Sequence, residues 1–139
     1  GDGGKRRTFA DESCVQAVGG ESWRCLEGPE AYAHVVSPLF VAQNLVDGAQ
    51  VFSEGRVPHE PWPPAPEAEE YIERWHANVS AHLRAGPCAE GRRGGVWAPS
   101  CFQHVQPLMA QFADKGYTVG GLTLGEAYAR WYRDRDGEG

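Results

Sequence analysis

One short apolar run, Ser37–Val46, most constrains how this chain can fold. Apolar side chains fill Leu39–Ala42 and return at Leu45 and Val46, without the strict alternation of a half-exposed strand. A strand buried on both faces of a parallel sheet has this pattern, and such a sheet carries helices on its faces. The run ends at Asp47-Gly48, which predicts a turn. It therefore favours an α/β fold.

Helical patterns lie further along the chain. Glu67–Leu83 predicts the clearest helix, because it opens with acidic residues and its apolar residues then recur at three- and four-residue steps. Val96–Ala98 predicts a short strand, and Gln103–Ala113 predicts a helix after it. Thr123-Leu124-Gly125-Glu126 has the spacing of a capping box, which predicts the start of a last helix. Strand, helix, strand, helix is the order typical of parallel α/β folds.

Glycine and proline predict long irregular connections. The chain has 18 glycines and 10 prolines, together about one fifth of its 139 residues, and this length suits one domain. Residues 1–34 have no sustained period and predict loop, with room for one short helix. Pro58–Pro66 predicts a surface loop, since proline lacks a backbone donor, and Gly91–Gly95 predicts a second loop. The charged tail from Asp134 onward is expected to fray.

Charge and hydropathy exclude two classes of partner. The net charge is −6, which opposes binding to a phosphate backbone, so no nucleic-acid partner is expected. No run approaches the roughly 18 apolar residues that cross a bilayer, so no membrane span is expected. The first residues lack the apolar core of a signal peptide, and any export signal is expected upstream of Gly1.

The cysteines favour disulfides over a metal site. They lack a CxxC pair and the histidine spacing of a zinc site, and we expect neither a metal nor an organic cofactor. If all four cysteines form disulfides within the chain, three pairings are possible, and the sequence does not choose among them. Disulfides favour an oxidising compartment, and the glycosylation sequon at Asn78 agrees with a secreted, extracellular or cell-wall protein. The four disulfide candidates are Cys14, Cys25, Cys88 and Cys101.

Two candidate catalytic residues, Asp47 and His104, follow the predicted strands. Ligands of open α/β sheets bind beyond the carboxyl ends of the strands. An acid followed by a histidine is also the order of the last two members of the Ser-Asp-His triad in α/β-hydrolases. In a triad the imidazole takes the serine proton, and the carboxylate orients the ring. The alternatives are that Asp47 is a plain turn residue and that His104 caps a helix or packs on the surface.

Two segments that carry these residues resemble the pectin acetylesterase and Notum family of secreted serine esterases. Ser37–Val51 is similar to the family's acid-bearing strand, including an Asp-x-x-Gln sequence, and Ser100-Cys101-Phe102-Gln103-His104 is similar to its Ser-Cys-Phe-x-His signature. The resemblance implies that Asp47 is the triad acid and that His104 is the general base. It leaves Cys101 as an expected disulfide partner rather than a nucleophile.

Further segments extend the resemblance over most of the chain. Trp97-Ala98-Pro99 is similar to the animal Notum branch, whereas Thr123–Ala127 and Trp131–Arg135 are similar to the closing helix of the plant enzymes. The interval from Cys14 to Cys25 resembles a pair of family cysteines. One departure is Val105, where plant members carry a further cysteine.

The resemblance implies the carboxyl-terminal part of one α/β-hydrolase domain, loop-rich and disulfide-stapled, over residues 1–139. The chain has no Gly-x-Ser-x-Gly segment, so the nucleophile is expected on an amino-terminal portion or partner chain, without which the domain is incomplete. The implied substrate is an acetylated polysaccharide or an acylated protein. The alternative function is a non-catalytic structural or binding module of an extracellular assembly.

Overall fold

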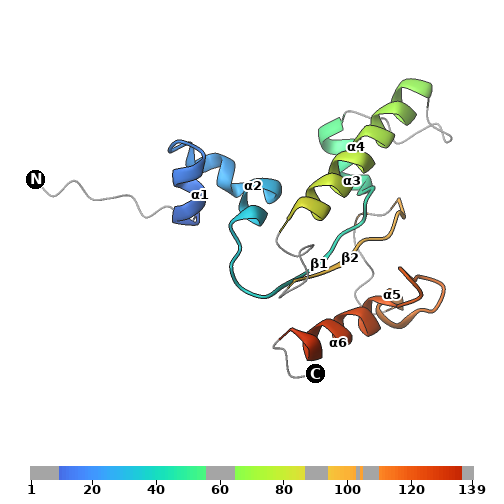
Figure 1. Cartoon of the computed structure of the whole chain (residues 1–139). Helices are drawn as coiled ribbons and strands as arrows, with labels where there is room; N and C mark the ends of the chain where they lie inside the picture. Colours follow the sequence, from blue (N-terminus) through green and yellow to red (C-terminus); the bar gives the residue numbers. More distant parts are fainter. Residues whose placement is uncertain (1–9, 56–64, 87–93, 103, 105–109, 136–139) are drawn as a thin grey trace, which may run out of the picture. The chain divides into compact units, whose positions relative to one another are not determined.

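The structure is a computed structural model that divides into two compact units, Gly1–Ser37 and Pro38–Gly139 (Figure 1). The residues that the structure describes are 10–55, 65–86, 94–102, 104 and 110–135.

The first unit contains three short helices closed by a disulfide. They are α1 (Glu12–Ala17), the 3₁₀ helix η1 (Ser22–Leu26) and α2 (Gly28–Ala33). Cys14 in α1 and Cys25 in η1 are both buried and form a disulfide, which is the pairing that the family resemblance implies. The prediction of loop with at most one short helix is therefore wrong for residues 10–34. Helices of five or six residues are too short to produce a readable hydrophobic period.

The second unit is built on a two-stranded parallel sheet. Strand β1 (Leu39–Ala42) pairs with β2 (Gly94–Trp97), with Leu39 opposite Gly94 and Ala42 opposite Trp97. This confirms a strand in the Ser37–Val46 run, although the strand is shorter than the run. Ala98 follows β2 rather than ending it, and two glycines of the predicted loop, Gly94 and Gly95, belong to the strand.

The two segments that follow β1 and β2 stay aligned beyond the strands. The Gln43 N–H donates to the Trp97 carbonyl at 3.2 Å, and the Leu45 N–H donates to the Pro99 carbonyl at 2.9 Å. Val46 then forms an isolated parallel bridge with Phe102. The parallel alignment therefore continues to the residues that precede both candidate catalytic positions.

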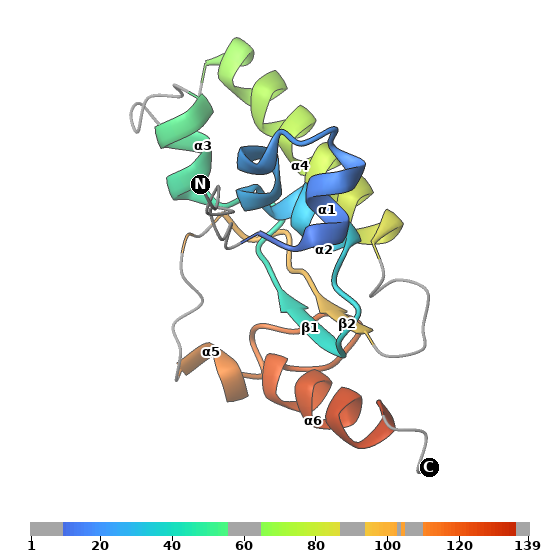
Figure 2. The same cartoon turned by 90° about the vertical axis from the view of Figure 1, so that its left-hand side faces the viewer.

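Helix α6 (Leu124–Asp134) covers one face of the sheet (Figure 2). The Phe40 ring of β1 contacts the rings of Tyr128 and Trp131, with centroid separations of 5.4 and 5.5 Å. A Cβ atom at Gly95 would lie 2.5 Å from Phe40 and 2.8 Å from Trp131. A side chain would collide with both rings here, which explains why glycine occupies position 95 of the strand.

Two helices between the strands lie on the other side of the sheet (Figures 1 and 2). They are α3 (Gly48–Gly55) and α4 (Pro66–Ala85), and the second confirms the helix predicted over Glu67–Leu83. Buried Val46 and Val51 form their core, and partly buried side chains pack around it, namely Phe52, Ala68, Tyr71, Ile72, Trp75 and Phe102. None of the described helices is long and apolar enough to cross a membrane.

Several predicted segments differ from the structure or lie outside it. The turn predicted at Asp47-Gly48 is instead the start of α3, because the Val51 N–H bonds to the Asp47 carbonyl at 2.9 Å and continues the chain as a helix. Pro66 begins α4, and residues 58–64 of the predicted loop are outside the described residues. Of the helix predicted over Gln103–Ala113, only α5 (Ala110–Ala113) is described as helical.

Helix α6 begins with the predicted capping box. The Glu126 N–H donates to Thr123 Oγ1 at 3.2 Å, and the Thr123 N–H donates to Glu126 Oε2 at 3.0 Å. Lys115 forms an ion pair with the same carboxylate. The hydrogen bond from Lys115 and then those from Thr123 lower the pKa of Glu126 from 4.5 to about 2.

Replacing Glu126 with glutamine gives a pH-dependent loss of stability. A lowered folded-state pKa stabilises the fold above the unfolded value of 4.5, and this contribution is lost as the pH falls towards about 2. Glu126→Gln should therefore lower the thermal unfolding midpoint at neutral pH, and the difference from wild type should vanish near pH 2. Unfolding midpoints measured across this range test the prediction, and a difference that does not change with pH would contradict it.

Replacing Gly95 with alanine should loosen the contact between the sheet and α6. The added methyl would overlap Phe40 and Trp131, and overpacking of this kind costs about 1–3 kcal/mol. Gly28→Ala is the matched control, because a Cβ there meets no atom within 4 Å. Urea unfolding of both variants measures the difference, and equal stabilities would refute the proposed close packing.

Candidate active site

Asp47 combines a buried position with a helix-capping role. The residue is only 5% exposed, and it directly precedes α3. Its Oδ1 atom accepts a hydrogen bond from the Gln50 N–H at 3.1 Å, as the side chain of an N-cap residue does. A Cβ at Gly48 would lie 3.3 Å from the Phe102 ring, so the glycine lets that ring approach the start of α3. The local sequence thus fixes where the carboxylate lies.

His104 lies against this carboxylate. Its Nδ1 atom is 2.8 Å from Asp47 Oδ1, although the two residues are 57 positions apart in the sequence. A carboxylate can only accept, so Nδ1 carries the proton and donates it to Asp47. In the neutral ring the lone pair is then on Nε2. The His104 side chain is 59% exposed, compared with 7% for Asp47, so the ring extends from a buried anchor towards the surface.

The alignment of the strands accounts for this meeting. The bridge between Val46 and Phe102 places the residues immediately before Asp47 and shortly before His104 side by side. The Phe102 ring also packs edge-to-face on Phe52 of α3, with centroids 5.3 Å apart. Both candidate side chains therefore follow the carboxyl ends of parallel strands, where open α/β folds bind their ligands.

A serine–histidine contact in the first unit has the wrong hydrogen-bond polarity for catalysis. Ser13 Oγ donates to Asp11 Oδ1 at 2.6 Å, and His34 Nδ1 is 2.9 Å from the same hydroxyl. The hydroxyl has one proton, which goes to Asp11, so His34 must donate and cannot act as the base. The pKa of Asp11 is lowered, chiefly by the Ser13 hydroxyl and then by the Cys14 amide.

The remaining candidates are the four cysteines and Asn78. Cys101 has a free thiol in the structure. Cys14 and Cys25 bond to each other, and Cys88 lies outside the described residues, so a disulfide of Cys101 stays a prediction. Asn78 is exposed on α4, and its glycosylation stays a prediction. Within the described ranges, no group of three His, Cys, Asp or Glu residues could hold a metal ion.

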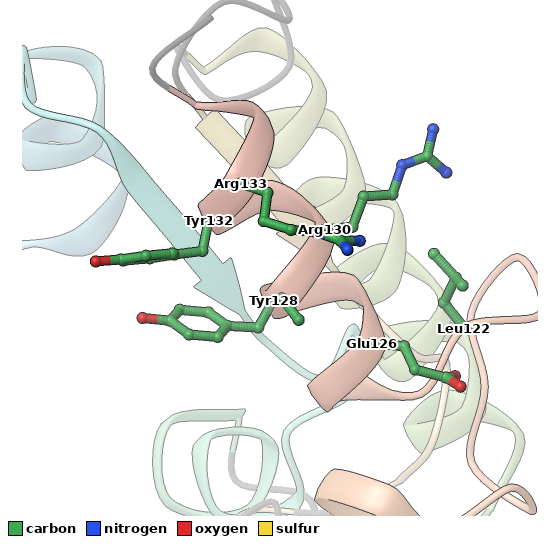
Figure 3. A pocket seen from close by; sticks show the side chains of 7 residues that line it. Leu122, Glu126, Tyr128, Arg130, Tyr132 and Arg133 are labelled. Carbon is green, nitrogen blue, oxygen red and sulfur yellow. The ribbon is translucent and has the colours of Figure 1, made fainter. Parts of the chain in front are cut away.

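Two hollows on the described surface lie along α6, and Figure 3 shows side chains that line one of them. One, of about 600 Å³, is lined by Leu122 and by residues of α6 that include Glu126 and Arg133. The other, of about 280 Å³, lies between α6 and residues Gly94–Val96 of β2. Neither includes Asp47 or His104.

The structure adds one functional contact that the sequence patterns did not assign. The backbone N–H of Gln50 holds the same carboxylate oxygen as His104 does. The available signal was the aspartate itself, because an N-cap aspartate accepts the backbone N–H of the second or third helical residue whatever the side chain of that residue.

Substitutions at Asp47 should separate its two roles. Asparagine is also a good N-cap, so Asp47→Asn should change the free energy of unfolding little, whereas Asp47→Ala should cost about 1 kcal/mol through the lost cap. Both should remove the charge beside His104. Urea unfolding and the imidazole resonances of His104 together test this, and equal loss of stability in the two variants would argue against capping.

Comparison with known proteins adds an independent finding. The family model for pectinacetylesterases matches residues 3–138. The chain is 32% identical over 93 residues to the palmitoleoyl-protein carboxylesterase NOTUM of Drosophila melanogaster, covering 67% of this chain and 12% of that protein. It is 28% identical over 127 residues to the palmitoleoyl-protein carboxylesterase notum1a of Danio rerio, covering 88% of this chain and 22% of that protein. No solved structure matches.

Proposed function

Because this chain belongs to the pectinacetylesterase family, we propose that it supplies the acid and the base of a Ser-Asp-His triad in a secreted carboxylic-ester hydrolase. The observation that carries the proposal is the 2.8 Å hydrogen bond between His104 Nδ1 and Asp47 Oδ1. The family implies a hydrolase-like α/β fold, and the parallel β1–β2 pair flanked by helices agrees with it. We assign the chain to the carboxyl-terminal part of an α/β-hydrolase domain.

In this mechanism His104 Nε2 takes the proton of a serine hydroxyl as the oxygen attacks the ester carbonyl carbon. A tetrahedral intermediate forms, and the proton then passes from His104 to the departing alkoxide as the ester C–O bond breaks. Water attacks the acyl-enzyme by the same route, with His104 again as the base. Buried Asp47 holds the Nδ1–H tautomer throughout and stabilises the transient imidazolium.

The serine belongs, in this proposal, to a polypeptide segment outside these 139 residues. Among the described residues, no serine hydroxyl is hydrogen-bonded to His104, and the sequence has no Gly-x-Ser-x-Gly turn. The chain spans only 12% and 22% of the length of the two Notum relatives. Their additional length gives ample room for a nucleophile and for the backbone amides that would stabilise the oxyanion.

The proposed substrate is an acyl ester on an extracellular polysaccharide or protein. The family name points to acetyl esters of pectin, and the relatives are named for removing a palmitoleoyl group from protein. The buried Cys14–Cys25 disulfide supports secretion, because such bonds persist in oxidising compartments.

Replacing His104 with alanine tests this function. In the native assembly, His104→Ala should lower hydrolysis of a chromogenic acetate ester by at least about a thousandfold, because the serine loses its base. His82→Ala is the matched control, since His82 is exposed on α4 and its Nδ1 contacts only the Asn78 carbonyl. Undiminished turnover in His104→Ala would reject the triad and favour the alternative, a non-catalytic extracellular module.

A further inference from the structure

Asn78 lies on an exposed side of α4, where a large group can be attached. Ala77 and Ala81, its neighbours on the helix surface, are exposed as well and have the smallest side chains of any residue except glycine. Asn78 does not belong to the side of the helix that packs on Val46 and Val51. The α4 residues on that side are Ala68, Tyr71, Ile72 and Trp75.

The longer neighbouring side chains also leave the Asn78 amide open. One turn earlier, Arg74 is held by Glu70, with 2.5 Å between Arg74 Nη1 and Glu70 Oε1. One turn later, the His82 ring folds back on the helix, and its Nδ1 lies 2.8 Å from the backbone carbonyl oxygen of Asn78. No described residue hydrogen-bonds to the side-chain amide of Asn78. The amide therefore projects into solvent.

Asparagine is an unfavourable residue for the interior of α4 on structural grounds. It is a poorer helix former than alanine, because its amide competes for backbone hydrogen bonds. Asn44, the other asparagine of the chain, is 2% exposed and so contributes to the buried part of the fold. Asn78 gains neither burial nor a side-chain hydrogen bond within the described residues. Its presence therefore points to chemistry at the amide rather than to packing.

The sequence Asn78-Val79-Ser80 is an acceptor for N-linked glycosylation. In an extended chain, residues two apart point to the same side, so an enzyme can contact the amide and the hydroxyl together. In α4 they do not face each other, and Ser80 is only 9% exposed. A sugar is therefore attached before α4 folds, and the folded helix has to leave room for it. The exposed Asn78 side chain meets that requirement.

We propose that Asn78 carries an N-linked glycan, added before α4 folds, and that this side of α4 stays in solvent in the complete esterase. The Asn78 amide nitrogen forms a bond to the anomeric carbon of an oligosaccharide carried on a lipid diphosphate. The C–O bond to the diphosphate breaks, the lipid diphosphate leaves, and the nitrogen loses a proton. A glycan is bulky and hydrophilic, so it fits only on the surface. The proposal rests on the secretion included in the proposed function, because the export route supplies this donor.

Peptide mapping of the native secreted protein tests the site. Treatment with peptide N-glycosidase in heavy-oxygen water converts a glycosylated asparagine to labelled aspartate, and trypsin then releases Trp75–Arg84, which contains Asn78. Asn78 should be labelled. Asn44, in a different tryptic peptide, is the control for spontaneous deamidation and should stay unlabelled. An unlabelled Asn78, or equal labelling of both asparagines, would overturn the proposal.

Two substitutions at Ser80 separate the glycan from the fold. Both change the same buried residue, but only Ser80→Thr keeps the acceptor sequence, whereas Ser80→Ala removes it. In denaturing electrophoresis, Ser80→Thr should migrate with wild type, and Ser80→Ala should migrate faster, together with Asn78→Gln. The comparison does not require a folded variant. A Ser80→Ala protein that migrates with wild type would contradict the glycan.

The Cys14–Cys25 disulfide separates failure of this proposal from failure of the proposed function. A non-reduced digest of the same sample reports the disulfide, which persists in an oxidising compartment. An intact disulfide with unmodified Asn78 would overturn the glycan alone. Absence of both would overturn the glycan and also argue against a secreted esterase. A glycan at Asn78 of a protein without esterase activity would support the glycan and reject only the hydrolase.

Discussion

The parallel alignment of β1 and β2 is the constraint on which the rest of the second unit depends. It continues past the strands through two further backbone hydrogen bonds and ends at the bridge between Val46 and Phe102. Side chains that come after this bridge on the two segments must meet, and Asp47 and His104 do so at 2.8 Å. The same alignment presses Phe40 and Gly95 against α6, so the packing of the helix and the geometry of the site share one cause.

In Asp47, a structural role and the proposed catalytic role coincide in one carboxylate. As the residue before Gly48 it caps α3, and the same oxygen that accepts the Gln50 amide also accepts the His104 ring. The turn predicted at Asp47-Gly48 is wrong because a helix begins there, and aspartate is favoured at helix starts as well as in turns. Capping immobilises the carboxylate, and an immobile carboxylate is what orients an imidazole for general-base catalysis.

The sequence predicted the features that local pattern controls. The helix over Glu67–Leu83 has a sustained period and the start of α6 has the Thr123 capping box, so both were predictable. The three helices before residue 34 are too short to carry such a period, and the Cys14–Cys25 disulfide joins two of them. Gly95 belongs to a strand because Phe40 and Trp131 crowd it, a tertiary contact that composition cannot reveal. The family-like motifs suggested that Asp47 pairs with His104. The hydrogen bond between Nδ1 and Oδ1 became visible only in the fold, because it depends on the alignment of two distant segments.

The small core of the described residues agrees with the proposal that this chain folds with a further segment. In the described part of the chain the buried apolar residues are few, and several aromatic side chains remain exposed, although 41% of the whole sequence is hydrophobic.

The most direct test of a triad shared across segments is fluorophosphonate labelling of the native protein, followed by peptide mapping. We predict one labelled serine outside residues 1–139, with labelling lost when His104 is replaced. A labelled serine within these residues, or labelling that does not need His104, would contradict the shared triad.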